Sequence, residues 1–421
     1  MPQHTIPRPV VLGVCLLMCG LGVAYLLYKI QQLAGSPGFD FRYIWLAGDM
    51  WLDGVNPYGD TYEATGAAKI EAGHVPIMWV YPPTWWAFAT PFGTLGLHAA
   101  NVAWNICGLV LVIAICGMTS SALISTFSSF SQSVASRFGG MVFLPVFSAL
   151  FFLMAILEAT AILFSVGQTT LIAGFGITLM LWGRINQRLF LEAIGLTLVI
   201  LKPQIGGPIA ILLLLLDHRS RKVVAISFVL SVLLMIPALV TAPGAIFHFL
   251  QNLGAYDGFT AANLPQSMTG IRLIIWEIAD IDIGNPIATV VTLAVILSLC
   301  VGPARVARSE DDQVLAWQIF GLTSAVIVAL APLHIYDFVL IAVPLAMLFL
   351  GGWVSSALAL CGALLIWRSE NLADVWAFHV PEVEIFPSSR LATIGAIIFL
   401  LAVISVTQQL NRQAVDRSVV T

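Results

Sequence analysis

Long runs of apolar residues, seldom interrupted by a charge, constrain the fold of this chain more than any other feature of its sequence. Apolar residues fill 59% of the 421 positions, and charged residues fill only 10%, whereas a soluble domain carries roughly 25% charged residues. A water-soluble fold could not cover so much apolar surface with so few charges. The sequence therefore predicts an integral membrane protein.

The apolar runs are continuous rather than alternating in segments of about ten residues, which favours membrane-crossing helices of about 20 residues over a β-barrel. We expect an all-α fold with about 12 transmembrane helices, in a range of roughly 10 to 13, and with helical outer loops. Three of these spans are short, and we expect them to be broken or tilted. The stretch Thr84–Leu95 contains Pro91 and is expected to lie along the surface. The expected spans are 10–27, 97–118, 139–157, 166–183, 189–201, 204–216, 223–242, 286–303, 314–331, 335–351, 353–367 and 391–406.

The basic residues orient these spans. With a cytoplasmic N-terminus, 11 of the 18 Lys and Arg residues fall in short connections on the inner side, as in His218-Arg219-Ser220-Arg221-Lys222, which follows the positive-inside rule. The first run then serves as a retained anchor; the competing interpretation is a secretory signal cleaved near Leu33-Ala34-Gly35-Ser36. We expect a single multispanning domain, 1–421, in the inner (plasma) membrane. Its long outer segments would be 28–83, 243–285 and 368–390, facing the periplasmic or extracellular side.

Several polar residues from different helices fall on this outer side. A polar group at membrane depth is costly and marks either a site or an internal contact. Gln168 alone is compatible with a helix-to-helix hydrogen bond, His334 with a helix cap, and Asp337 with a nearby base. Lys202 breaks the trend of the basic residues and precedes Pro203, which interrupts a helix, so its amine suits an anionic headgroup.

The first outer segment is rich in aromatic residues and net acidic. Asp40 stands between Phe39 and Phe41 just past the membrane boundary, where the desolvation of a carboxylate needs a reason. The tryptophans of this segment are explained by interfacial anchoring, but Asp40 is not. We therefore treat Asp40 as a candidate catalytic acid or base.

Other classes of site have little support. The six cysteines all lie in apolar stretches without the spacing of a metal site, and no acidic cluster has ligand spacing, so we expect no metal and no cofactor. The net charge of −4 argues against nucleic-acid binding.

Six short motifs in order resemble the GT-C superfamily, and within it glycosyltransferase family 87, the polyprenyl-phosphate-mannose-dependent α-1,2-mannosyltransferases and their arabinofuranosyltransferase relatives. The likeness covers about residues 10–350. The motifs are Asp40-Phe41-Arg42-Tyr43, Asn56-Pro57-Tyr58, Tyr81-Pro82-Pro83, Gly167-Gln168, Leu201-Lys202-Pro203-Gln204 and Pro332-Leu333-His334-Ile335-Tyr336-Asp337.

The resemblance implies a GT-C-like, inverting enzyme that moves a sugar, by default mannose, from a polyprenyl-phosphate donor to a lipid or glycan acceptor at the outer face. By position, Asp40 matches the family's catalytic base and His334 a histidine near the reacting centre. The remaining candidates are expected to bind substrate. They are Arg42, Tyr43, Tyr81, Gln168, Lys202, Gln204, Gln266, Ser267, Tyr336 and Asp337.

Two other functions remain open at this stage. A transporter or flippase for a lipid-linked or acidic substrate would also need polar groups in the membrane, but distributed through its depth and usually within an inverted repeat. A scaffold of an envelope complex would not require Asp40, Lys202 and His334 together. Because the polar groups cluster on one side, we favour the glycosyltransferase.

Overall fold

A computed structural model of the protein describes residues 5–33, 37–70, 75–256, 264–306, 312–367, 369 and 388–420. Within these ranges every regular element is helical, as expected for an all-α protein. The greater part of the expected outer segment 368–390, and of the alternative cleavage region at 33–36, lies outside the described residues.

Six of the described helices are long and apolar enough to cross a membrane. They are α1 (Arg8–Leu33), α5 (Leu97–Thr126), α12 (His218–Thr241), α15 (Gly284–Val306), α16 (Asp312–Leu330) and α20 (Ser388–Val420). A seventh span exists if α7 (Phe143–Ile156) and α8 (Glu158–Val166), which meet at a bend of 59°, cross together. The protein is therefore a multi-pass membrane protein, although the expected count of twelve spans is not confirmed.

The remaining apolar segments are helical but short. They form α9 (Thr170–Ile185), α10 (Leu189–Ile200), α11 (Pro203–Leu216), the consecutive elements η4 (Ile335–Ile341), α17 (Ala342–Met347) and η5 (Leu348–Leu350), and α18 (Trp353–Trp367). A helix rises about 1.5 Å per residue, so α10 with its 12 residues covers about 18 Å of a bilayer core that is about 30 Å thick. Breaks at glycine and proline cause this shortening: Gly167 ends α8 with a left-handed φ of 73°, and Pro203 separates α11 from α10.

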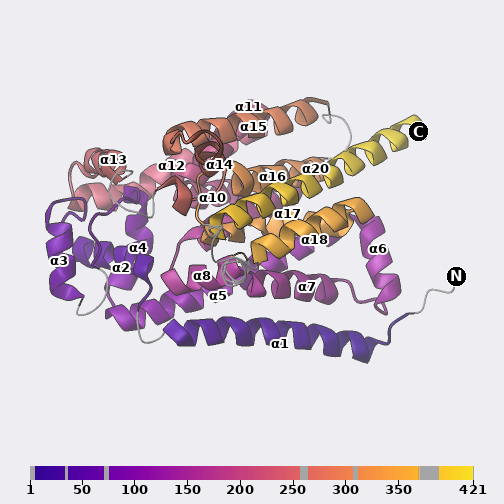
Figure 1. Ribbon diagram of the computed structural model, residues 1–421, viewed down its shortest axis with the longest axis horizontal. Coiled ribbons are helices and arrows are strands. Elements are labelled where there is room, and N and C mark those ends of the chain that lie inside the picture. The colour runs from indigo at the N-terminus through magenta and orange to yellow at the C-terminus, as the bar shows by residue number, and fades with distance from the viewer. Residues whose placement is uncertain are drawn as a thin grey trace.

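The first outer segment folds against one end of the bundle. Its elements are α2 (Phe39–Leu52), α3 (Thr61–Lys69), η1 (Pro83–Trp85) and α4 (Trp86–Gly93). They gather beside α13 (Ala245–Tyr256) at the left of Figure 1, whereas both termini and α6 (Ser128–Arg137) lie at the opposite end. Helix α4 has eight residues and rises about 12 Å, too little to cross a membrane. It packs closely on α2, because a Cβ on Gly48 would lie 2.2 Å from the carbonyl oxygen of Ala89.

Before α15, the second outer segment contributes η3 (Pro265–Ser267) and α14 (Ile271–Ala279). The guanidinium of Arg272 is buried and donates to both carboxylate oxygens of Asp282 at 2.7 Å. This bidentate pair fixes α14 against the start of α15.

Helices α9 and α10 form an antiparallel hairpin that connects the two ends of the bundle. A Cβ on Gly176 would lie 2.6 Å from the carbonyl oxygen of Gly195, and a Cβ on Gly195 would lie 2.6 Å from that of Gly176. Because glycine lets two helix backbones approach this closely, the hairpin is tightly packed.

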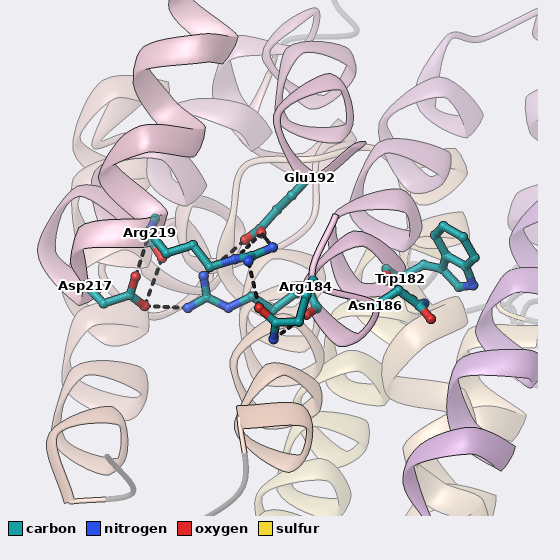
Figure 2. Close-up of polar contacts among 8 residues, drawn as sticks. Trp182, Arg184, Asn186, Glu192, Asp217 and Arg219 are labelled. Carbon is teal, nitrogen blue, oxygen red and sulfur yellow. Dashed lines mark hydrogen bonds and ion pairs between the residues drawn. The ribbon is translucent and has the colours of Figure 1, made fainter. Parts of the chain in front are cut away.

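A charge cluster lies at the turn between α9 and α10 (Figure 2). Glu192 is fully buried and lies between two guanidinium groups, with 3.4 Å to Nη1 of Arg184 and 3.0 Å to Nη2 of Arg219. Arg184 also bonds Asp217, which caps α12 by accepting from the backbone N–H of Ser220 at 2.8 Å. Two basic residues that we expected on the inner side, Arg184 and Arg219, are thus paired with acids, of which Glu192 is buried and Asp217 is partly exposed.

Candidate active site

Asp40 lies at the first turn of α2, where two glycines let the outer segment approach the bundle. A Cβ on Gly38 would lie 2.6 Å from the carbonyl carbon of Val166, and a Cβ on Gly167 would lie 2.5 Å from Cβ of Phe41. This approach places the carboxylate of Asp40 beside Gln168, whose Nε2 donates to Oδ2 of Asp40 at 2.8 Å. Two motifs separated by more than 120 residues therefore meet in one hydrogen bond.

The surroundings of Asp40 change its acidity. Burial raises the pKa of Asp40 to about 6, and the nearby charge of Asp337 acts in the same direction. The hydrogen bond from Gln168 and the charge of Lys202 oppose this shift. A carboxyl group that titrates near neutral pH is suited to general acid or base catalysis.

Lys202 lies at the break between α10 and α11, where Pro203 cannot continue the hydrogen-bond ladder of the helix. Its side chain is only 6% exposed. The amine donates to Oγ1 of Thr170 at 2.6 Å and to Oδ1 of Asp337 at 2.7 Å. The lysine expected to meet an anionic headgroup is therefore part of a buried ion pair.

The turn before η4 supplies the acid of this pair. Asp337 is 2% exposed and accepts from the amine of Lys202, from the hydroxyl of Thr170 and, at 3.2 Å, from the backbone N–H of His334. The ring of Tyr336 lies 5.0 Å from that of His334, and the amine of Lys202 lies 5.6 Å from the centre of the Tyr336 ring. The late motif of the sequence thus converges on the helix break.

The pKa of His334 is lowered, chiefly because the ring is buried and also because Lys202 is near. Asp337 and a hydrogen bond to the backbone of Ser267 oppose this effect. The ring is therefore neutral at neutral pH, so it can donate or accept a hydrogen bond without adding a charge to the site.

Among the other candidates, Ser267 meets the centre through its backbone, whereas Arg42, Tyr43 and Tyr81 lie in the first outer segment. Nε of Arg42 donates to the carbonyl of Pro37 at 3.1 Å, and the carbonyl of Tyr43 accepts from the hydroxyl of Tyr62 at 2.9 Å. The ring of Tyr81 packs at 4.8 Å from Trp79. These contacts hold the outer segment together. The side chains of Gln204, Gln266 and Ser267 are exposed, and their role in substrate binding stays a prediction.

Part of the sequence also matches a known protein family. The model of glycosyltransferase family 87 matches residues 79–332, which is more than half of the chain. The chain belongs to glycosyltransferase family 87. No curated protein matches the sequence. The matched region contains Gln168, Thr170 and Lys202. Asp40 and His334 lie outside the matched region in the sequence, but the fold places them beside these residues.

An apolar cavity of about 430 Å³ borders the centre of this family 87 glycosyltransferase. Its wall includes residues of α4, α5, α8, α9 and α10 together with Gln168. Two wall residues on α5, Ile106 and Val110, are 58% and 59% exposed. Because α5 is a candidate membrane span, the cavity adjoins the lipid-facing surface at one side and the polar centre at the other.

Two further residues of the enzyme's site, Thr170 and Trp85, were not among those predicted from the sequence. Thr170 bridges Lys202 and Asp337, but a threonine at a helix start is usually read as a cap. Trp85 is fully buried and donates from Nε1 to the carbonyl of Leu201, next to Lys202. Its sequence signal was only that of an interfacial tryptophan. Among the residues that the structure describes, no group of three or more His, Cys, Asp or Glu could hold a metal ion.

Proposed function

We propose that this glycosyltransferase takes a sugar from a polyprenyl-phosphate donor and transfers it, with inversion, to a lipid or glycan acceptor at the outer face of the inner (plasma) membrane. One observation carries the proposal: the side chain of Gln168 donates a hydrogen bond to Asp40, and Gln168 also lines the apolar cavity. A ligand with a long apolar tail and a polar head would fit this combination.

The cavity supports a lipid-linked donor. Its walls are almost wholly apolar, and it adjoins the lipid-facing side of α5. An isoprenoid chain could pass from the bilayer into this cavity at little cost in free energy. Each of its CH₂ groups is stabilised by about 0.8 kcal/mol relative to water in both apolar environments. A nucleotide sugar, in contrast, would bring a charged diphosphate and a polar ribose to an apolar wall.

The donor's phosphate would meet the amine of Lys202. An ammonium group has three N–H donors, and Thr170 and Asp337 accept two of them. The third can point to a phosphate oxygen, where it would stabilise the charge that grows on the leaving group. A phosphate leaves without a general acid, so one cation and neutral donors such as His334 and Gln168 supply what this step needs.

Asp40 would act as the general base. Inversion requires a group that removes the proton of the acceptor hydroxyl on the sugar face opposite the leaving phosphate. The hydrogen bond from Gln168 occupies one carboxylate oxygen of Asp40, which leaves the other oxygen for the acceptor. A pKa of about 6 keeps the carboxylate ionised at neutral pH and basic enough to accept the proton.

The test uses the purified full-length protein in liposomes with radiolabelled polyprenyl-phosphate-mannose and a membrane lipid extract as acceptor. We expect labelled lipid or glycan product, with the anomeric configuration inverted by NMR. Asp40→Asn should lower turnover by about 10² to 10⁴ without altering expression. Asp60→Asn is the matched control, because Asp60 lies in the same outer segment and is exposed.

Three results would decide against the proposal. Normal turnover of Asp40→Asn would remove Asp40 as the base. Retention of the donor's anomeric configuration would exclude direct displacement. Movement of intact labelled donor across the liposome membrane, with no product, would favour the flippase.

A further inference from the structure

The break between α10 and α11 leaves one backbone carbonyl without its helical donor. In a continuous helix the carbonyl of Leu201 would accept from the N–H of Ile205. Here the N–H of Ile205 donates instead to the carbonyl of Lys202 at 2.9 Å, and that of Lys202 donates to Val199 at 3.0 Å. Pro203 has no N–H to offer. The carbonyl of Leu201 is buried and needs another partner.

An indole from the first outer segment supplies this partner. Nε1 of Trp85 donates to the carbonyl of Leu201 at 3.0 Å, and the side chain of Trp85 is fully buried. Its ring is held between Tyr81, at a centroid distance of 5.2 Å, and Phe88, at 5.8 Å. The hydrogen bond therefore fixes the peptide that carries Lys202 from a distant part of the chain.

We infer that Trp85 is a positioning residue for Lys202. The bond to Leu201 holds the broken backbone in the one arrangement that directs the Lys202 amine at Thr170 and Asp337. Without it the peptide between Leu201 and Lys202 would rotate to find another donor, and the amine would move with it. Only the catalytic part of this inference rests on the proposed function, because the position of the Lys202 amine can be measured without the sugar donor.

The first test measures how accessible the Lys202 amine is to acetylation in the folded protein. Purified Trp85→Phe, which removes the indole N–H and keeps an aromatic ring, is treated with sulfo-N-hydroxysuccinimide acetate. Acetylation at Lys202 is then quantified by mass spectrometry against exposed Lys222. We expect the labelling rate of Lys202 to rise about threefold or more, as for the loss of one hydrogen bond, and that of Lys222 to stay unchanged.

The matched control is the neighbouring tryptophan. The indole nitrogen of Trp86 is buried and has no hydrogen-bond partner among the residues that the structure describes, so Trp86→Phe removes the same atoms without breaking a bond to any of them. Lys202 should stay protected in this variant. If Trp85→Phe does not yield folded protein, benzothienylalanine at position 85 keeps the bicyclic shape and replaces only the N–H by sulfur. Equal labelling of Lys202 in the wild type and in the N–H-deleted protein would overturn the inference.

The second test follows the reaction. Trp85→Phe should raise the donor KM and lower kcat by about three- to tenfold in total, while the acceptor KM and the temperature of unfolding stay near those of Trp86→Phe. The losses from Trp85→Phe and Lys202→Arg should be less than additive, because both disturb the same amine. Additive losses would contradict a role through Lys202. An inactive wild type with normal protection of Lys202 would refute only the proposed function.

Discussion

The ion pair between Lys202 and Asp337 allows stability and catalysis to be separated. Both side chains are buried, 6% and 3% exposed, and the amine lies 2.7 Å from the carboxylate. Removing one partner of a buried pair costs roughly 3–5 kcal/mol, because the other charge remains without compensation. Asp337 would keep its bonds from the Thr170 hydroxyl and the His334 N–H, so we expect Lys202→Gln to lose about 3 kcal/mol, the lower end of that range.

The double variant Lys202→Gln with Asp337→Asn should behave differently. Replacing both charges by amides removes the uncompensated carboxylate, so most of the lost stability should return. Activity should not return, since neither amide carries the positive charge that the leaving phosphate needs. Lys202→Arg should retain part of the activity, because its charge survives although its geometry differs.

The assay is thermal unfolding of the purified proteins in one detergent, followed by tryptophan fluorescence, together with initial rates at varied donor and acceptor. Lys202→Gln should unfold several degrees below the wild type, and the double variant should unfold between them. We also expect Lys202→Gln to raise the donor KM and leave the acceptor KM nearly unchanged. A single variant as stable as the wild type, or a double variant no more stable than the single one, would refute this reasoning.

Three further predictions address the base, the glycine contact and the topology. The value of kcat/KM should fall as the pH drops through about 6, the pKa of Asp40, because only the ionised carboxylate accepts a proton; a limb near pH 4 in a pH–rate profile would contradict this. Gly167→Ala should lower both turnover and the unfolding temperature, since φ is 73° and the new Cβ would lie 2.5 Å from Cβ of Phe41, and the left-handed backbone alone costs roughly 1–2 kcal/mol; wild-type behaviour in both assays would argue against the close approach. A cysteine in place of exposed Thr61 should react with an impermeant thiol reagent in intact cells, and one in place of exposed Lys222 should not; the reverse pattern would invert the orientation.

The sequence by itself determined the class of fold. A membrane offers no water to backbone groups, so a long apolar run must satisfy its own hydrogen bonds as a helix. Every expected apolar segment accordingly contains a helix. The number of complete spans did not follow, because Gly167 and Pro203 end helices within apolar runs. Whether such a break leaves a short helix or a bent span depends on whether neighbouring helices supply hydrogen-bond partners for the backbone groups that the break leaves unpaired.

The tertiary structure alone decided which polar residues meet. Sequence indicated that Asp40, Gln168, Lys202 and Asp337 share one side of the membrane, because each lies at the outer end of a helix. It could not reveal that Lys202 pairs with Asp337 or that Asp40 bonds Gln168, because each partner is more than 120 residues away. The contact between Asp40 and Gln168 forms because Gly38 and Gly167 let two distant backbones approach closely.

The roles of Glu192 and Trp85 show the same limit most clearly. In sequence, Glu192 is a single acid within an apolar run, and Trp85 is one of several tryptophans near a membrane boundary. In the structure, Glu192 is buried between Arg184 and Arg219 and pairs with both. Trp85 donates to the carbonyl of Leu201, which the helix break leaves without its helical partner. Local sequence specifies which groups a helix leaves unsatisfied, but long-range packing decides which side chain satisfies them.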